Sequence, residues 1–340
     1  MNVLYRFFLV ALLSGILLAG NGGRVEASNY VTVATLGNRY TLSNNSLSMQ
    51  QMVDRVSEFW KRELQQLVPF QPDLIVLPEV CDIPRGLAND RHAEYLRARG
   101  TQVEEMFSSF AREHRCYIAY GTIRPAGGVE SHNTLVVIGR DGGITGTYIK
   151  NFPTIYEMEA GSVPGTATDL IQCDFGTVAG VICFDLNFEE LLGKYAAKKP
   201  DILLFSSLYH GGLVQDYWAF RCQSYLVASM LRTEIPSEVR NPLGEVVAST
   251  NNYQDFAVAR INLDRKMVHL DYNREKLNAL KAKYTSAVSI SVPGRLGVAL
   301  ITSEHERVTA EEMVREFGIE LLDDYFSRSR AAVRENLPAR

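Results

Sequence analysis

Three residues with reactive side chains each follow an apolar run of the sequence. Glu79 ends the stretch LIVLPE, Lys150 ends GTYIK, and Cys183 ends GVIC. A short apolar run is typical of a buried strand, which presents the residue at its carboxyl end to a cleft. A thiol, an ammonium and a carboxylate are groups that can attack a carbonyl carbon, stabilise the resulting charge and move a proton. Together they predict a site for chemistry on an acyl group.

A thiol attacks as thiolate, and no histidine motif accompanies Cys183. Glu79 is therefore the candidate base, which takes the thiol proton and returns it to the leaving amine. Lys150 and the backbone N–H of Phe184 are the candidate donors to the oxyanion of the tetrahedral intermediate. A thioester then remains for water to hydrolyse. We expect no cofactor.

Metal binding is not expected from the pattern of histidines and cysteines. The six histidines show no HExxH or similar spacing, and the five cysteines form no CxxC pair. The net charge is −4, and no dense stripe of Lys and Arg interrupts the sequence. Such a chain does not neutralise a phosphate backbone, so we expect no nucleic-acid partner.

The elements that must position these residues alternate between strands and helices. We expect strands over residues 30–36, 73–77, 116–123, 132–138, 144–149, 175–183 and 202–206, and helices over 47–67, 92–114 and 188–197. The segment GRDGG at 139–143 predicts a hairpin turn. Purely parallel sheets have few hairpins, so this α/β pattern favours a mixed sheet or a two-sheet sandwich with outer helices.

The first 27 residues differ in composition from the rest. Arg6 precedes the apolar run FFLVALLSGILLAG, and VEA precedes Ser28, which is the layout of a signal peptide. The run is shorter than the roughly 20 apolar residues that cross a bilayer. We expect cleavage after Ala27 and export to the periplasm or the extracellular space. An uncleaved membrane anchor is the alternative.

The remaining chain is divided by a change of composition near Tyr284. Residues 28–285 are expected to form the catalytic domain, because 46% of the whole chain is hydrophobic and can build a large core. Residues 286–340 begin rich in Ser, Val, Pro and Gly and continue as a charged amphipathic stretch. We expect a partly helical C-terminal extension there, and the sequence assigns it no function.

The order and surroundings of the three reactive residues resemble the nitrilase superfamily of carbon–nitrogen hydrolases. Pro78-Glu79 resembles the family's Glu motif, and Tyr148-Ile149-Lys150, which lies ahead of Pro164-Gly165, resembles its Lys motif. The stretch ICFDLNFE around Cys183 resembles its Cys motif. The likeness runs from about residue 31 to 261. It departs from many members after Trp218, where FRCQSY lacks a Glu-Asn pair, so contacts at the far end of the substrate stay undefined.

This resemblance implies a fold, further site residues and an assembly. The fold is a two-sheet αββα sandwich, and the assembly is a homodimer or a higher homo-oligomer. A second carboxylate is expected beside Lys150, and both Glu157 and Glu159 lie in the right interval; we prefer Glu159. The loop after strand 202–206 makes Tyr209 a substrate-pocket residue, while Asp185 is expected to fix the turn after the nucleophile rather than to transfer protons.

The resemblance also implies the reaction. Phe184-Asp185 follows Cys183, as in the amidase-like and carbamoylase-like branches, whereas nitrile-cleaving branches commonly have Trp-Glu there. We therefore expect hydrolysis of a small carboxamide or N-carbamoyl compound, with release of ammonia or an amine. An acyltransferase that uses the same thioester and a catalytically silent binding or assembly module are the alternatives.

Overall fold

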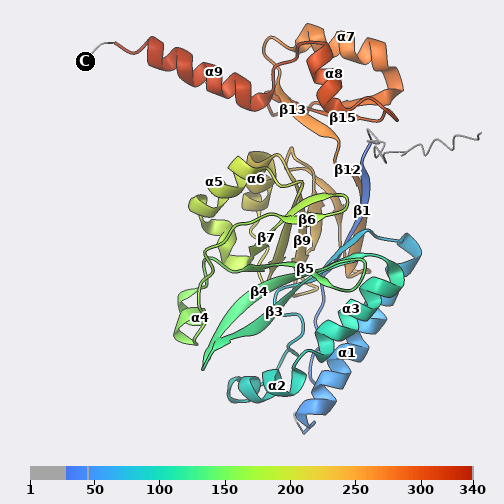
Figure 1. Ribbon diagram of the computed structural model, residues 1–340, viewed down its shortest axis with the longest axis vertical. Helices are drawn as coiled ribbons and strands as arrows, with labels where there is room; N and C mark the ends of the chain where they lie inside the picture. The colour runs from blue at the N-terminus through green and yellow to red at the C-terminus, as the bar shows by residue number, and fades with distance from the viewer. Residues whose placement is uncertain (1–27, 44–45, 339–340) are drawn as a thin grey trace, which may run out of the picture.

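Two six-stranded sheets lie face to face in the part of the chain that the structure describes (Figure 1). The structure is a computed structural model and describes residues 28–43 and 46–338, so the expected signal peptide at 1–27 lies outside the described residues. The first sheet has the order β12-β1-β2-β3-β4-β5 and consists of Phe256–Asn262, Tyr30–Leu36, Leu74–Val76, Tyr117–Gly127, Glu130–Ile138 and Ile144–Ile149. The second has the order β11-β10-β9-β8-β7-β6 and consists of Val246–Ser249, Glu238–Arg240, Tyr225–Met230, Ile202–Ser207, Gly176–Ile182 and Ile171–Cys173.

Both sheets are mixed, as the hairpins in the sequence predict. Strands β1, β2 and β3 are parallel to one another, and so are β7, β8 and β9, whereas the outer strands pair antiparallel. The parallel strands carry almost only apolar residues because both of their faces are covered. Strand β1 contributes residues to two cores. Val31 and Val33 lie in the core between the sheets, and Ala34 and Leu36 lie in the core under the helices.

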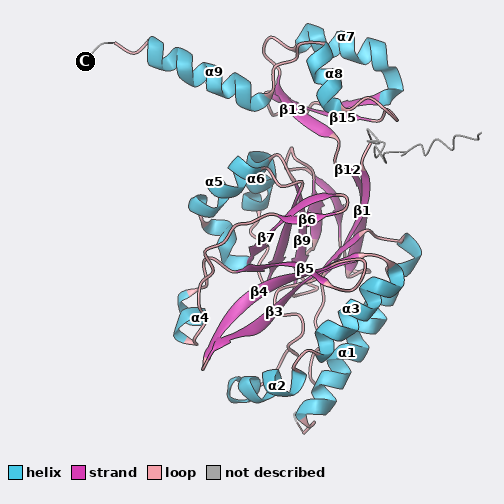
Figure 2. Ribbon diagram, in the orientation of Figure 1, coloured by secondary structure: helices cyan, strands magenta, loops and turns pink. Residues whose placement is uncertain are grey.

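Helices cover the outer face of each sheet, which completes the αββα sandwich and confirms the expected fold (Figure 2). On the first sheet lie α1, α2 and α3, which span Met49–Gln65, His92–Arg99 and Gln102–His114. On the second lie α5 and α6, which span Glu189–Lys198 and Leu213–Cys222. The single helix expected over 92–114 is two helices, because Gly100 has a φ of +47° and ends α2.

Buried hydroxyl groups tie the two sheets together. Thr35 Oγ1 donates to the carbonyl oxygen of Ala228 at 2.7 Å, and Ser229 Oγ donates to that of Leu36 at 2.8 Å. Ser206 Oγ donates to the carbonyl oxygen of Leu77 at 2.8 Å. Leu77 stands two residues ahead of Glu79, so the second sheet fixes the strand end that delivers this residue.

A third sheet builds the C-terminal unit and changes the expected domain boundary. It has the order β13-β15-β14 and consists of Arg265–His269, Val298–Ser303 and Val288–Ser291. Three helices accompany it, α7, α8 and α9, which span Arg274–Tyr284, Ala310–Glu316 and Leu322–Glu335. The boundary expected at 285/286 is wrong, since the unit begins at Arg265, where the chain leaves β12 and pairs with β15. Figure 1 shows this unit beyond one end of the sandwich, with α9 directed away from it.

None of the helices within residues 28–43 and 46–338 is long and apolar enough to cross a membrane.

One glycine allows the segment that carries Glu79 to pass close to β3. A Cβ atom on Gly121 would lie 2.5 Å from Glu79 Cα and 2.9 Å from the carbonyl oxygen of Pro78, which is closer than real Cβ contacts. Gly121→Ala should therefore lower the free energy of unfolding by about 1–3 kcal/mol, measured by urea denaturation.

Gly193→Ala is the matched control, because a Cβ there meets no atom within 4 Å in helix α5. It should raise the free energy of unfolding by about 0.5–1 kcal/mol. Equal stability of the wild type and Gly121→Ala would show that the contact is relieved without cost.

Candidate active site

The ammonium group of Lys150 lies between two carboxylates. Lys150 directly follows β5, and its Nζ atom is 3.0 Å from Glu79 Oε1 and 2.9 and 2.8 Å from the two carboxylate oxygens of Glu157. The residue is 1% exposed. Burial acts to lower the pKa of Lys150, but the neighbouring charges, that of Glu79 first, act more strongly and raise it above its ordinary value. Lys150 is thus held as a cation.

Glu79 reaches this site from a turn at the carboxyl end of β2. The chain folds over β3, with the Gly121 N–H donating to the carbonyl oxygen of Pro78 at 3.1 Å. Val80 has a φ of +44°, a left-handed conformation that is strained for a β-branched residue. Asp82 holds the far side of the turn, because its Oδ2 accepts hydrogen bonds from Arg99 and Thr122 at 2.7 and 2.6 Å. Strain of this kind persists only where surrounding contacts enforce it.

The two carboxylate oxygens of Glu79 have different surroundings. Oε1 accepts hydrogen bonds from Lys150 Nζ and, at 2.8 Å, from Asn133 Nδ2. Oε2 is buried and has no hydrogen-bond partner among the described residues. A buried oxygen without a partner is unfavourable for stability. One oxygen of Glu79 is therefore fixed, and the other can take a proton.

Cys183 begins the 3-10 helix η3, Cys183–Asn187, directly after β7, and has a φ of +48°. The buried carboxylate of Asp185 holds this turn. Its Oδ2 accepts from the Ile182 N–H at 3.0 Å and from the Tyr148 hydroxyl at 2.8 Å, and its Oδ1 accepts from the Phe152 N–H at 2.7 Å. Burial raises the pKa of Asp185 to about 6, against these hydrogen bonds. Asp185 thus joins the cysteine turn to the chain around Lys150, in agreement with its expected structural part.

The surroundings of the Cys183 thiol favour its uncharged form. Burial first, and then the charge of Glu79, raise its pKa to about 12, although the charge of Lys150 and hydrogen bonding from Leu208 and Ser207 act to lower it. Cys183 is half-buried, whereas the other free cysteines of the described chain, Cys81, Cys116, Cys173 and Cys222, are buried. A thiol with this pKa needs a base before it can act as a nucleophile.

The second carboxylate beside Lys150 is Glu157, so the preference for Glu159 is wrong. Both residues lie on the short helix α4, Ile155–Glu159. Thr154 caps this helix: its Oγ1 accepts from the Glu157 N–H at 3.2 Å, and its own N–H donates to Glu157 Oε2 at 2.7 Å. This capping box turns Glu157 inward, and Glu159 is exposed at the other end of the helix. Burial acts to raise the pKa of Glu157, but Lys150 and the cap lower it overall.

Half-buried aromatic rings lie beside the nucleophile. The hydroxyl of Tyr209 accepts from Asn187 Nδ2 at 2.9 Å, and burial first, then the charge of Cys183, raise the pKa of Tyr209 to about 12. The ring of Phe184 meets the edge of Phe188 at a centroid distance of 5.2 Å, and Phe188 stacks on Phe152 at 3.9 Å. The structure therefore places Tyr209 and Phe184 near Cys183, and their contact with the substrate stays a prediction.

Asn133, on β4, was not expected from the sequence. Its Nδ2 donates to Glu79 Oε1 and, at 2.9 Å, to Glu157 Oε1, while its carbonyl oxygen accepts from the Lys150 N–H at 2.9 Å. Asn133 thus contacts all three charged residues of the site.

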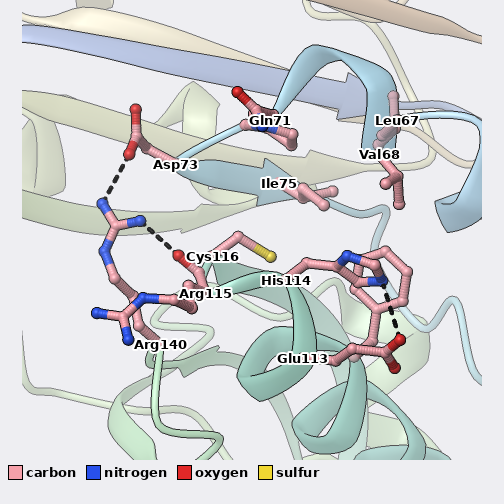
Figure 3. Close-up of a pocket in the computed structure, with 12 residues that line it drawn as sticks. Leu67, Val68, Gln71, Asp73, Ile75, Glu113, His114, Arg115, Cys116 and Arg140 are labelled. Carbon is pink, nitrogen blue, oxygen red and sulfur yellow. Dashed lines mark hydrogen bonds and ion pairs between the residues drawn. The ribbon is translucent and has the colours of Figure 1, made fainter.

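A separate cavity of about 420 Å³ lies at the opposite ends of the same strands (Figure 3). Figure 3 shows Asp73 and Ile75 from the start of β2, Cys116 from the segment ahead of β3, and Arg140, which pairs with Asp73 at 2.7 Å. Because β2 runs from this cavity toward Glu79, the cavity is not part of the site around Cys183. Across the described residues, no three His, Cys, Asp or Glu side chains are grouped to hold a metal ion.

The fold and the sequence together place the chain in a class of enzymes that cleave carbon–nitrogen bonds. The sequence profile of the carbon–nitrogen hydrolase family matches residues 32–265. The chain belongs to this family, and the resemblance to the amidase-like branch of the nitrilase superfamily is confirmed.

Similar proteins agree with this assignment. The chain is 28% identical to omega-amidase NIT2 of Danio rerio over 214 residues, which cover 56% of this chain and 76% of that protein. It is 27% identical to the human omega-amidase NIT2 over 217 residues, which cover 56% of this chain and 77% of that protein. A carbon–nitrogen hydrolase from Helicobacter pylori shares the fold with a TM-score of 0.58 at 18% identity, covering 69% of this chain and 90% of that one. An amidase from Nesterenkonia sp. shares the fold with a TM-score of 0.58 at 16% identity, covering 78% of this chain and 100% of that one.

The two glutamates of α4 give a matched pair of variants. Glu157→Gln removes the charge that holds Lys150 from one side, and misplacement of a charged group by about 1 Å can cost roughly 10² in rate. We expect Glu157→Gln to lower kcat/KM for amide hydrolysis by about that factor, and Glu159→Gln to change it less than about twofold. An equal loss in both variants, in steady-state assays of ammonia release, contradicts the assignment of Glu157.

Proposed function

We propose that this enzyme hydrolyses a small carboxamide or N-carbamoyl compound through a thioester on Cys183. The observation that carries the proposal is the buried pair of Glu79 and Lys150 beside a half-buried thiol, with one oxygen of Glu79 left without a hydrogen-bond partner in the described part of the chain. A mutant of the Nesterenkonia amidase holds the acetamide moiety of fluoroacetamide covalently at its active-site cysteine, so the cysteine of that amidase is a nucleophile.

In the first step, Glu79 Oε2 takes the proton of the Cys183 thiol as the sulfur attacks the carbonyl carbon of the amide. The carbonyl double bond opens, and its oxygen becomes an oxyanion. Lys150 and the backbone N–H of Phe184 supply positive charge and a hydrogen bond to this oxyanion. Groups that are already oriented before the reaction stabilise such charge without reorganisation.

In the second step, the carbon–nitrogen bond breaks and Glu79 returns its proton to the departing nitrogen, so ammonia or an amine leaves. The carbonyl re-forms as a thioester on Cys183. Water then attacks this thioester while Glu79 accepts one of its protons. The bond between carbon and sulfur breaks, the carboxylic acid leaves, and the thiol regains its proton from Glu79.

The alternative of a silent binding module is less well supported by the buried charges. The ammonium of Lys150 and the carboxylate of Glu79 are costly to remove from water, and a part in the reaction accounts for their burial. Acyl transfer to an amine uses the same thioester. The two reactions are separated by whether an added amine, such as hydroxylamine, replaces water as acceptor at millimolar concentration.

Substitution of the three central residues tests the mechanism. Cys183→Ala should abolish hydrolysis, while Glu79→Gln and Lys150→Ala should each lower kcat by about 10² to 10⁴, because each removes one proton-transfer group or oxyanion donor. Circular dichroism should show that all three variants fold. Substantial activity in a folded Cys183→Ala variant would overturn the proposal.

The choice of amides over nitriles follows from the leaving group. An amide expels an amine that must be protonated as it departs, and Glu79 can return a proton to it, whereas attack on a nitrile first produces a thioimidate. The residues after Cys183 and the omega-amidases among the relatives also favour amides. In assays of matched amides and nitriles with one acyl group, kcat/KM should be higher for the amides. The reverse order across the series contradicts this substrate class.

We also propose that the enzyme is exported after cleavage behind Ala27, which the apolar run and the VEA site support. N-terminal sequencing of the protein secreted by its native host should begin at Ser28. A membrane-bound product that keeps Met1 would instead establish the uncleaved anchor.

A further inference from the structure

The amide of Asn133 completes the surroundings of the two glutamates at the site. Asn133 is 2% exposed, and its Nδ2 atom directs hydrogen bonds at Glu79 Oε1 and Glu157 Oε1, at 2.8 and 2.9 Å. Lys150 Nζ contacts the same two oxygens at 3.0 and 2.9 Å. The two carboxylates thus share two donors, of which one is charged and the other neutral.

The neutrality of this second donor is important for a base. A second cation at this position would stabilise the carboxylate of Glu79 so strongly that it would bind a proton poorly. Removal of the donor would leave the carboxylate held by Lys150 alone, and the ionised form would be less stable. An amide satisfies the lone pair of Oε1 and adds no charge to the site.

The amide also determines which oxygen is available. Oε1 of Glu79 accepts from both donors, and Oε2 is buried and has no partner within residues 28–43 and 46–338. The Asn133 amide cannot turn over, because its Oδ1 would then face two carboxylate oxygens at hydrogen-bond distance. Oδ1 itself is buried without a partner among the described residues, which is unfavourable for stability. The donor group of Asn133 is therefore present at the site although its buried Oδ1 atom lowers stability.

We infer that Asn133 is a positioning residue for the base: it fixes Glu79 by Oε1, directs proton transfer to Oε2, and maintains Glu79 in the ionised form that accepts the thiol proton. This inference rests on the proposed part of Glu79 and Cys183 in hydrolysis. The charged and titratable groups around Glu79 are Lys150 at the end of β5, Glu157 on α4 and Cys183 at the start of η3. Asp185 and Tyr209 lie next to these groups, and their charges interact with Lys150 and Cys183.

The rate at which iodoacetamide alkylates Cys183 in the free enzyme, measured against pH, tests this inference without knowledge of the substrate. The reaction needs a base that accepts the thiol proton, so the rate should fall at low pH. Asn133→Ser removes the donor to Oε1 and should move this acid limb to higher pH by roughly one to two units, the value of one hydrogen bond to a charged group. Asn133→Asp adds a third carboxylate and should move the acid limb to higher pH by at least the same amount.

Asn273→Ser is the matched control, because Asn273 is also buried and its Nδ2 donates to two backbone carbonyls in the C-terminal unit, those of His269 and Glu320. This variant should lower the unfolding temperature and leave the acid limb in place. A lower plateau with an unmoved acid limb in both Asn133 variants would show that Asn133 is only structural and overturn the inference.

Mass spectrometry of the alkylated peptides separates this failure from that of the proposed function. Alkylation should lie on Cys183, and Cys183→Ala should be inactive toward amides. Residual hydrolysis in Cys183→Ala overturns the proposed function, and the inference falls with it.

Discussion

The buried ammonium of Lys150 needs anionic partners, and this requirement governs the arrangement of the site. An ammonium removed from water is unstable unless charges and hydrogen bonds compensate it. Glu79 and Glu157 compensate it from two sides, at distances of 2.8 to 3.0 Å. The end of β5, the turn after β2 and the short helix α4 must therefore converge at one point. Loss of Glu79 or Glu157 leaves the ammonium with a single carboxylate, and loss of Lys150 leaves both carboxylates without a cation, so the three elements depend on one another although they are distant in sequence.

The convergence is achieved by strained segments that the surrounding sandwich holds in place. Val80 and Cys183 both adopt left-handed backbone conformations, one beside the base and the other at the nucleophile. A buried aspartate holds each of these two turns. Asp82 anchors the first turn through Arg99, and Asp185 anchors the second through three hydrogen bonds. The hydroxyl of Ser206 also joins the two sheets just ahead of the first turn, where it donates to the carbonyl oxygen of Leu77.

Much of this arrangement could be predicted from the sequence, and the failures have physical reasons. Strands buried on both faces give uninterrupted apolar runs, so the main strands and the residues at their ends were found. The choice between Glu157 and Glu159 failed because both satisfy the same interval. The Thr154-x-x-Glu157 pattern of a capping box contains the signal that favours Glu157.

Asn133 could not be predicted from the sequence, because a polar residue on a strand does not indicate which charges will converge on it. The unit that begins at Arg265 was also placed too late, since pairing between β13 and β15 is a long-range contact that local composition does not record.

The balance of charge at the site explains why a neutral thiol and an anionic base suit the proposed reaction. Before attack, the site holds the negative charges of Glu79 and Glu157 and the positive charge of Lys150, while burial keeps the Cys183 thiol protonated, with a pKa of about 12. After attack, Glu79 has become neutral and the oxyanion carries its former charge. The net charge of the buried site is unchanged, and one negative charge has moved within reach of the same ammonium. A thiolate formed in advance by loss of its proton to solvent, with Glu79 still ionised, would instead add a third negative charge to this site, which the low dielectric of the interior makes costly. Coupling proton transfer to attack avoids that state, and it requires the free oxygen of Glu79 to be fixed before the substrate arrives.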